Sequence, residues 1–385
     1  MSRSRNEVLV SVASSLTSCS SEASLELYEK RLKPSIETIR MSPTGLQGLV
    51  ATAEKIIDEK FSPDPQSTYT YKEFDAEGIS VELDKIMIAM LACVEECGGE
   101  SGKRYVASAI VACSKEEDVV GALAALGTTW LTHFLFAFKT GCHRGTRNQR
   151  KSSVSDDLMI RDGYTCIVTG AQDEAHPAPI RGGFKCNLVA AQILRGRFGN
   201  FGKGQTSQSI KSALRTFDIL VNFTGIPVKT LDELHTLIDH PSNGIMLEPN
   251  ARVSFNNFTW CLKATEEKHA YNVKIFKDHG LVTAANAINR PITFMDHSHD
   301  FSQGSTGKRR NCSLELPNRD FSAIHAAIAE VLNMSGAGRF FDVLLNKYNR
   351  GSAFDVRSWP ELEALMGERL LSESVTQIFQ LAKVY

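Results

Sequence analysis

Apolar residues recur every three to four positions through most of the first 140 residues. This spacing places them on one face of a helix, so we expect residues 1–140 to form a helical N-terminal domain. Gly98 and Gly99 are expected to end one of its helices, because glycine tolerates the left-handed geometry of a helix C-terminus. The predicted helices cover residues 25–32, 46–61, 79–97, 100–113 and 115–138.

One stretch of this half is apolar on every side, since residues 119–138 contain no Asp, Glu, Lys or Arg. Its length meets the requirement for a membrane span. Thr132 and His133 lie inside it, however, and the amphipathic helices around it need an apolar partner. We therefore favour a buried core helix and expect no membrane association. A membrane span is the alternative.

Beyond residue 140 the helical spacing gives way to short apolar runs between polar loops. Residues 141–157 lack an apolar period and are rich in Ser, Gly and Arg, which predicts a basic linker. The Asp162–Gly163 turn precedes a run rich in β-formers, so residues 164–169 are a predicted strand. Residues 291–316 are polar and predict a loop, and helical spacing returns over 317–385, which predicts a helical C-terminal region.

The most informative run is PSNGIMLEPNARVSFNNF, residues 241–258. It begins with turn residues, continues into the apolar run 245–247, and resumes with spaced apolar positions after Pro249. We interpret it as a turn, a strand and a helix with Asn250 as the N-cap. With helices on both sides, the whole pattern predicts an α+β fold in which residues 158–290 form the central domain.

Charge is uneven along a chain whose net charge is only −1 over 385 residues. Residues 139–216 hold 13 Lys or Arg against five Asp or Glu, a local balance of +8. Such an excess favours a polyanionic partner, and nucleic acid is the expected one. The alternative is a solvated surface that acidic helices elsewhere neutralise in space.

Cysteine usage indicates the compartment. The nine cysteines are scattered, odd in number and without a CxxC pair. This argues against a disulfide framework and against a standard structural zinc site. We expect an intracellular protein of the nucleus or cytoplasm.

Three segments of the central domain carry a resemblance to a known family. They read RDGYTCIVTG at 161–170, AAQIL at 190–194 and NGIML at 243–247. In order and spacing they resemble the HNH nuclease domain proteins of mushroom-forming fungi. This resemblance implies a ββα-finger within the central domain and an endonuclease that hydrolyses phosphodiester bonds with a divalent ion, Mg²⁺ or Zn²⁺.

The resemblance also assigns three polar roles at the site. One histidine acts as the general base, an asparagine orients it, and a second histidine helps to hold the metal. Here the base position is Gln192, the metal-ligand position is Arg252, and only the asparagine is retained, as Asn243. Glutamine does not accept a proton at useful pH, and arginine does not ligate a cation. We expect hydrolysis to be weak or absent.

Other residues are candidates to complete such a site. His176 is a candidate replacement base, and His240, which follows Asp239, is a candidate metal ligand. Arg195, Arg197 and Arg252 are candidate phosphate-binding residues, since a guanidinium pairs well with phosphate oxygens. DNA binding would then survive the loss of cleavage. The alternative is a protein-interaction or scaffold module in which the nuclease fold is vestigial.

Overall fold

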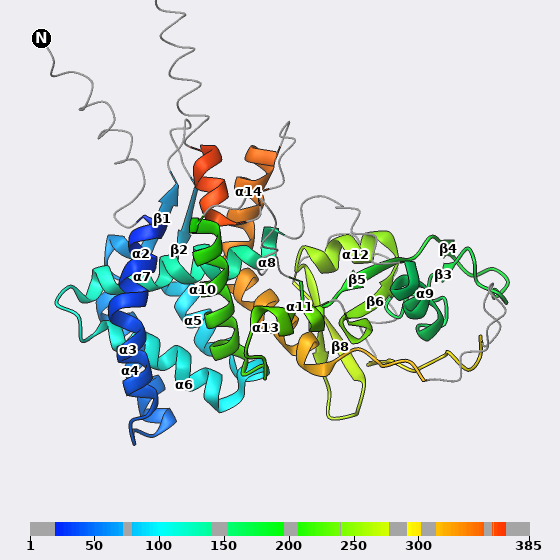
Figure 1. Cartoon of the computed structure of the whole chain (residues 1–385), viewed down its shortest axis with the longest axis horizontal. Helices are drawn as coiled ribbons and strands as arrows, with labels where there is room; N and C mark the ends of the chain where they lie inside the picture. Colours follow the sequence, from blue (N-terminus) through cyan, green and yellow to red (C-terminus); the bar gives the residue numbers. More distant parts are fainter. Residues whose placement is uncertain are drawn as a thin grey trace, which may run out of the picture.

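The computed structural model describes residues 20–71, 79–140, 152–195, 207–238, 240–276, 291–301, 313–349, 356 and 358–366. Figure 1 shows an elongated arrangement with helices at one end and a mixture of strands and helices at the other. We call these the helical lobe (residues 20–140, 207–224 and 337–349) and the mixed lobe (residues 152–195, 231–276 and 291–301). The fold is α+β, as the sequence pattern predicts.

The helical lobe is a stack of helices around a large apolar core. Three of its helical stretches contain π-helical turns, labelled η2, η3 and η5. In chain order the elements are α2 (Ser21–Leu27), η2 (Tyr28–Leu32), α3 (Lys33–Arg40), α4 (Leu46–Ile56), η3 (Ile57–Phe61), η4 (Pro65–Ser67), α5 (Leu83–Cys93), α6 (Glu95–Cys113), α7 (Val119–Thr129), η5 (Trp130–Leu135), α8 (Phe136–Thr140), α10 (Ser207–Thr224) and α14 (Ala337–Asn349).

The candidate membrane span is the central helix of this lobe. The helices α7, η5 and α8 run on as one helix, Val119–Thr140, which is long and apolar enough to cross a membrane by length and composition. Inside the protein, however, 83% of its most apolar window is buried. Trp130, Phe134 and Phe136 are fully buried. The segment therefore lies where a core helix lies, which is consistent with a soluble protein.

The all-helical prediction for residues 1–140 is wrong at one place. Strands β1 (Thr68–Tyr71) and β2 (Ile79–Glu82) form an antiparallel pair, and the following helix begins at Leu83 instead of Ile79. In β1 the burial alternates and covers Tyr69 and Tyr71. This is the two-residue period of a strand, which four residues are too few to reveal against a helical background.

The prediction that Gly98 and Gly99 end a helix is confirmed at Gly99, whose non-helical backbone, with a φ of +53°, divides α6 into two helical stretches. The neighbouring glycines also have a packing role. A Cβ atom at Gly98 would lie 1.9 Å from the carbonyl oxygen of Phe223, and one at Gly102 would lie 2.4 Å from it. Glycine is therefore required because the end of α10 lies directly against α6.

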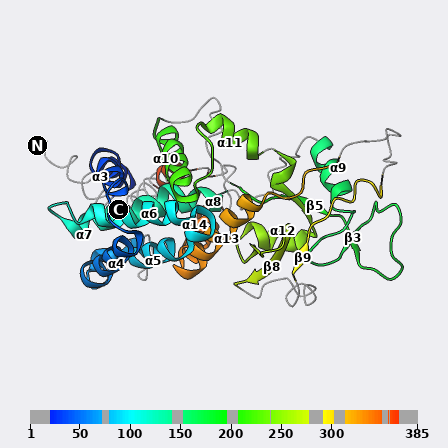
Figure 2. The same cartoon turned by 90° about the horizontal axis from the view of Figure 1, so that it is seen from below.

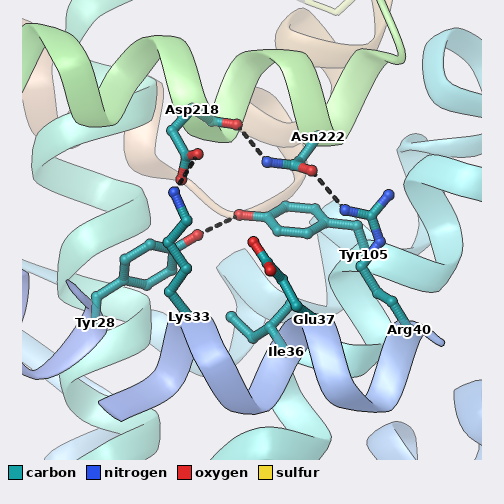
Figure 3. Close-up of a pocket in the computed structure, with 8 residues that line it drawn as sticks. All are labelled: Tyr28, Lys33, Ile36, Glu37, Arg40, Tyr105, Asp218 and Asn222. Atoms are coloured by element: carbon teal, nitrogen blue, oxygen red, sulfur yellow. Dashed lines mark hydrogen bonds and ion pairs between the residues drawn. The ribbon is translucent and has the colours of Figure 1, made fainter. Parts of the chain in front are cut away.

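Helix α10 belongs to the helical lobe although it comes from the middle of the sequence. It packs against α6 and η5, and Figure 3 shows the polar contacts that hold it to α3. Lys33 Nζ lies 2.7 Å from an Asp218 carboxylate oxygen, and Arg40 donates to the Asn222 side-chain oxygen over 2.5 Å. The cavity between these residues is about 10 Å³, which is room for a single water molecule.

The mixed lobe consists of short strands in small sheets, with helices between them. Strands β3 and β4 pair in parallel, β5 and β6 pair antiparallel, and β7, β8 and β9 form an antiparallel sheet. In chain order the elements are α9 (Ser152–Arg161), β3 (Gln172–Asp173), β4 (Lys185–Cys186), β5 (Val189–Gln192), α11 (Leu231–Ile238), η6 (Pro241–Asn243), β6 (Gly244–Leu247), α12 (Pro249–Asn256), β7 (Trp260–Ala264), β8 (Ala270–Ile275) and β9 (Ile292–Thr293).

Two local predictions in this lobe are wrong. The predicted strand at 164–169 is a series of turns with a single bridge between Thr165 and Gln172. Gly163 and Tyr164 both have positive φ, +63° and +52°, which an extended strand does not allow. The predicted linker is helical from residue 152, where α9 begins. Strand β9 also occupies two positions of the predicted polar loop.

Helix α13 (Arg319–Met334) joins the two lobes. It packs against β7 on one side and against α5 and α6 on the other, and Figure 2 shows it between the lobes. Lys263 of β7 bridges Glu96 of α6 and Glu330 of α13 at 3.1 and 2.8 Å. Lys274 of β8 also pairs with Glu330. These charges reinforce a junction that is otherwise apolar.

Candidate functional site

The run 241–258 forms the turn, strand and helix expected from its sequence. The turn is η6, the strand is β6, and the helix is α12. All four residues of β6 are buried. The N-cap of α12 is Glu248, whose carboxylate accepts from the backbone amides of Asn250 and Ala251 at 3.2 and 3.3 Å. The prediction of Asn250 as the cap is therefore wrong by two residues, because the longer glutamate side chain reaches past Pro249.

Asn243 is fully buried and bonded to the backbone on two sides. Its Oδ1 accepts from the Leu194 amide at 2.6 Å, and its Nδ2 donates to the carbonyls of Leu194 and Ile238, each at 2.9 Å. The side chain thereby ties the chain leaving β5 to the C-terminal end of α11. Through these bonds the Asn243 side chain holds the backbone at Leu194 and at Ile238 in place.

Gln192 lies beside Asn243. The two strands place Gln192 opposite Gly244, and its side-chain amide donates to the Ile238 carbonyl over 3.4 Å. Gln192 and Asn243 therefore meet at one oxygen in the last turn of α11, where carbonyls have no partner within the helix. The two amides act together as a C-terminal cap, and neither is a proton acceptor.

Arg252, the third predicted site residue, has a different environment. It is half-buried on α12, and its Nε is buried without a hydrogen-bond partner. Burial lowers the pKa of Arg252, and the positive charge of Arg195 lowers it further. Arg195 directly follows Leu194, the residue that Asn243 holds. The predicted site residues thus do converge at the end of β5, with two like charges beside each other.

A buried histidine lies on the same side of α12. His325 of α13 stacks on Phe255, with 3.9 Å between ring centres and 10° between the planes. Its Nε2 is 3.2 Å from the Phe255 carbonyl, and its Nδ1 is buried without a hydrogen-bond partner. Burial lowers the pKa of His325 to about 3, and the charge of Arg195 contributes in the same direction.

The residue that organises the opposite side of β6 is Arg161. Its guanidinium pairs with the neighbouring Asp162 and donates to the carbonyls of Pro241, Gly244 and Glu315 at 3.2, 2.6 and 3.0 Å. Asp162 in turn accepts from the Met246 amide at 2.8 Å. Both side chains are almost fully buried. The sequence marks this pair only through the segment RDGYTCIVTG and gives no sign of its contacts.

The basic excess of residues 139–216 is partly neutralised inside the protein. Arg161 pairs with Asp162, Lys139 is buried against Asp342 at 2.8 Å, and Arg215 pairs with Glu29 and Asp218. These cations are therefore not available to a polyanion. Within the described residues, the remaining exposed cations of this range are Arg181, Lys185 and Lys211. Arg144, Arg147, Arg150, Lys151, Arg197 and Lys203 lie outside the described residues.

The two candidate replacement histidines make local contacts. His176 accepts from the Ala178 amide at 3.0 Å, and its ring packs against Tyr164 and Phe301. His240 caps η6 and lies 2.8 Å from the Ser242 hydroxyl and 3.7 Å from a Glu315 carboxylate oxygen. Asp239, its expected companion in a metal-ligand pair, lies outside the described residues.

The side chains at this site do not fit a divalent cation. Two carboxamides and two guanidiniums present no anionic ligand, and guanidiniums repel a cation. Over the part of the chain that the structure describes, no group of three His, Cys, Asp or Glu side chains could hold a metal ion. What the site does offer is positive charge and hydrogen-bond donors, which suit an anion.

Comparisons of the chain with protein-family models, with curated proteins and with solved structures gave no match. The assignment of function therefore rests on the geometry and charge of the residues around β6 and α12.

Proposed function

We propose that this protein is an HNH endonuclease-like protein that binds nucleic acid through backbone phosphates and cuts it weakly or not at all. The resemblance of its central segments to HNH nucleases supports this proposal. So does the antiparallel pairing of β5 with β6 and the helix α12 that directly follows β6, although α10 and α11 lie between the two strands in the chain. The nucleic acid is bound where that family holds its metal, at the position of Arg252.

The observation that carries the proposal is the Arg195–Arg252 pair. Arg252 places a buried, unpartnered Nε beside a second positive charge. A half-buried cation next to a like charge is unfavourable unless an anion neutralises it. A phosphate presents several oxygens in the plane that a guanidinium fork matches. Glu248 already occupies the first amides of α12, so the Arg252 side chain, rather than the helix N-terminus, supplies the donor.

The same geometry accounts for weak or absent cleavage. Gln192 and Asn243 donate to the Ile238 carbonyl and present no base to a water molecule. Loss of a general base costs roughly 10²- to 10⁴-fold in rate. The loss of a metal would remove several kcal/mol more of charge stabilisation. Phosphate affinity, by contrast, needs only a guanidinium with an unpartnered donor, which Arg252 supplies.

The test is a binding titration with a fluorescently labelled duplex at several salt concentrations. We expect Arg252→Met to weaken binding about tenfold, which is the scale of one charged hydrogen bond, and to reduce the salt slope by about one. Arg339→Met is the control, because Arg339 is an exposed arginine of the helical lobe. Wild-type protein should leave plasmid DNA uncut with Mg²⁺ or Mn²⁺. The proposal is refuted if Arg252→Met binds the duplex as tightly as wild-type protein, or if the protein cuts DNA and the cutting depends on Gln192.

A protein-interaction module is the second candidate, and helix α10 favours it. Ile210 and Leu214 are 37% and 50% exposed on its outer surface, and Phe217 and Val221 continue the same line at helical spacing. Exposed apolar stripes of this kind mark protein contacts. If a partner protein binds there, Leu214→Lys should abolish its capture and leave DNA binding unchanged.

A further inference from the structure

The connection between β3 and β4 ends in a well-held turn. The Gly183 amide donates to the Ile180 carbonyl over 3.3 Å, which closes a β-turn with Arg181 and Gly182 at its centre. Gly182 has a φ of +79°, a conformation that favours glycine at the third position of such a turn. The shape of the turn therefore follows directly from the Arg-Gly-Gly sequence.

One buried side chain fixes this turn to the body of the lobe. The side-chain Oε1 atom of Gln172 accepts from the backbone amide of Ile180 at 2.9 Å. The backbone amide of Gln172 donates to the Phe184 carbonyl, also at 2.9 Å. Gln172 itself is buried in β3. The turn is thus anchored at both ends, and the side chains it displays lose little further freedom when they bind a partner.

The anchored turn displays apolar side chains to solvent together with cations. Ile180 is 70% exposed and Phe184 is 63% exposed. Arg181 and Lys185 are exposed beside them. Figures 1 and 2 place β3 at the end of the mixed lobe farthest from the helical lobe, so the remaining described elements leave this surface open. An exposed aromatic ring close in sequence to two exposed cations suits a partner with both an apolar face and negative charge.

Further aromatic rings lie in segments next to β3. The Asp173 amide donates to the Tyr164 carbonyl over 2.8 Å, and the Tyr164 ring packs against His176 and Phe301 at 5.7 and 5.2 Å between ring centres. Tyr164 adopts a positive φ of +52°, which is uncommon for a residue with a side chain and is found at binding sites. The surface around β3 is therefore rich in aromatic rings.

We propose that the turn at residues 180–185 binds a single-stranded segment of nucleic acid, with Phe184 stacked on an unpaired base and with Arg181 and Lys185 on the adjoining phosphates. Every base offers a flat apolar face, but only an unpaired base exposes it to a side chain. The inference rests on the proposed function for the class of partner, and it adds the form of the strand. A surface of anionic lipid also combines apolar groups with negative charge. Two apolar side chains, however, give only a weak membrane anchor.

The experiment compares a single-stranded oligonucleotide carrying 2-aminopurine with the matching duplex. We expect wild-type protein to quench 2-aminopurine in the single strand, and Phe184→Ala to remove the quenching and weaken binding about tenfold, the scale of one stacked base. Duplex affinity should stay within twofold. Because Phe184 is mostly exposed, its truncation leaves folding nearly unchanged. Met41→Ala, which truncates an exposed residue of the helical lobe, is the matched control.

Each outcome separates the two proposals. Equal effects of Phe184→Ala on both nucleic acids, or no effect on either, overturn this inference and leave the Arg252 result standing. Loss of single-strand binding in Phe184→Ala together with an inert Arg252→Met supports this inference and refutes the proposed phosphate site. If wild-type protein binds neither nucleic acid, both proposals are wrong. If it sediments with phosphatidylserine vesicles through Phe184 and its single-strand binding does not depend on Phe184, only this inference is wrong.

Discussion

Arg161 and Arg252 lie on different sides of β6, and they differ in the partners that their positive charges have. At one side, Arg161 is buried, paired with Asp162 and bonded to three backbone carbonyls. At the other side, Arg252 is half-buried with an unpartnered Nε, and the like charge of Arg195 acts on it. We call these the paired side and the unpaired side. The same residue type thus meets a complete set of partners in one place and an incomplete set in the other.

This difference distinguishes an arginine that stabilises the fold, Arg161, from one that can bind a ligand, Arg252. A buried charge with all its partners holds the surrounding backbone together, and removing it leaves the other charge uncompensated. A charge without partners contributes little to folding and retains its capacity to bind an anion. A count of lysines and arginines gives Arg161 and Arg252 equal weight as candidates for DNA contact. Of these two arginines, Arg252 alone has a hydrogen-bonding nitrogen without a partner.

The largest effect is expected on the paired side. Arg161→Met leaves the Asp162 carboxylate buried without its cation, and we expect the free energy of unfolding to fall by about 3–5 kcal/mol. Arg252→Met should change it by less than about 1 kcal/mol, because that substitution removes an uncompensated charge. Urea unfolding of both variants measures the contrast. Equal losses would show that Arg252 has structural partners after all and would remove the distinction between the two sides.

A second test asks whether the retained asparagine acts in structure or in chemistry. Asn243→Ala removes three hydrogen bonds from fully buried groups, and we expect a loss of about 2–4 kcal/mol from unmet backbone donors and acceptors. Gln192→Ala removes one long, partly exposed bond and should cost less than about 1 kcal/mol. Thermal unfolding measures both. A stable Asn243→Ala variant that loses a nuclease activity would instead assign Asn243 a chemical role.

The sequence predicted those parts of the molecule that depend on local pattern. Amphipathic spacing identified the helices, and the run at 241–258 was interpreted correctly as turn, strand and helix because each part carries its own signal. The strand predicted at 164–169 failed because two successive positive φ values at Gly163 and Tyr164 redirect the chain. β-forming composition cannot reveal that conformation, since it depends on what the turn packs against.

At the site, residue types were predictable and their partners were not. The positions of Gln192, Asn243 and Arg252 followed from the resemblance to HNH nucleases. In the structure Gln192 and Asn243 meet at the Ile238 carbonyl, and Arg252 lies on α12. That Asn243 would be bonded to Leu194, and that Arg161 would donate to the carbonyls of Pro241, Gly244 and Glu315, depends on contacts between residues about 50 to 150 positions apart. A single sequence carries no record of such distant pairings.

The smallest expected effect is a pH dependence on the unpaired side. Burial lowers the pKa of His325 to about 3, below the ordinary value of about 6.5. Below pH 6.5 the unfolded chain therefore binds a proton that the folded protein refuses, and stability falls as the pH drops from 6.5 toward 3. Between pH 6.5 and pH 5 this amounts to roughly 2 kcal/mol. His133, whose pKa burial lowers to about 4, adds a parallel loss in the helical lobe.

His325→Leu should remove the first contribution and leave that of His133, so between about pH 6 and pH 4 the slope of unfolding free energy against pH should fall by one proton, about 1.4 kcal/mol per pH unit. Inorganic phosphate sharpens the test, because an anion between Arg195 and Arg252 would offset the Arg195 charge that disfavours protonated His325. In wild-type protein, phosphate should therefore raise the pKa of His325 and flatten the slope more than chloride at equal ionic strength does. In Arg252→Met the two salts should give the same slope. An identical response to phosphate in both proteins would place the anion elsewhere and leave the unpaired side without a ligand.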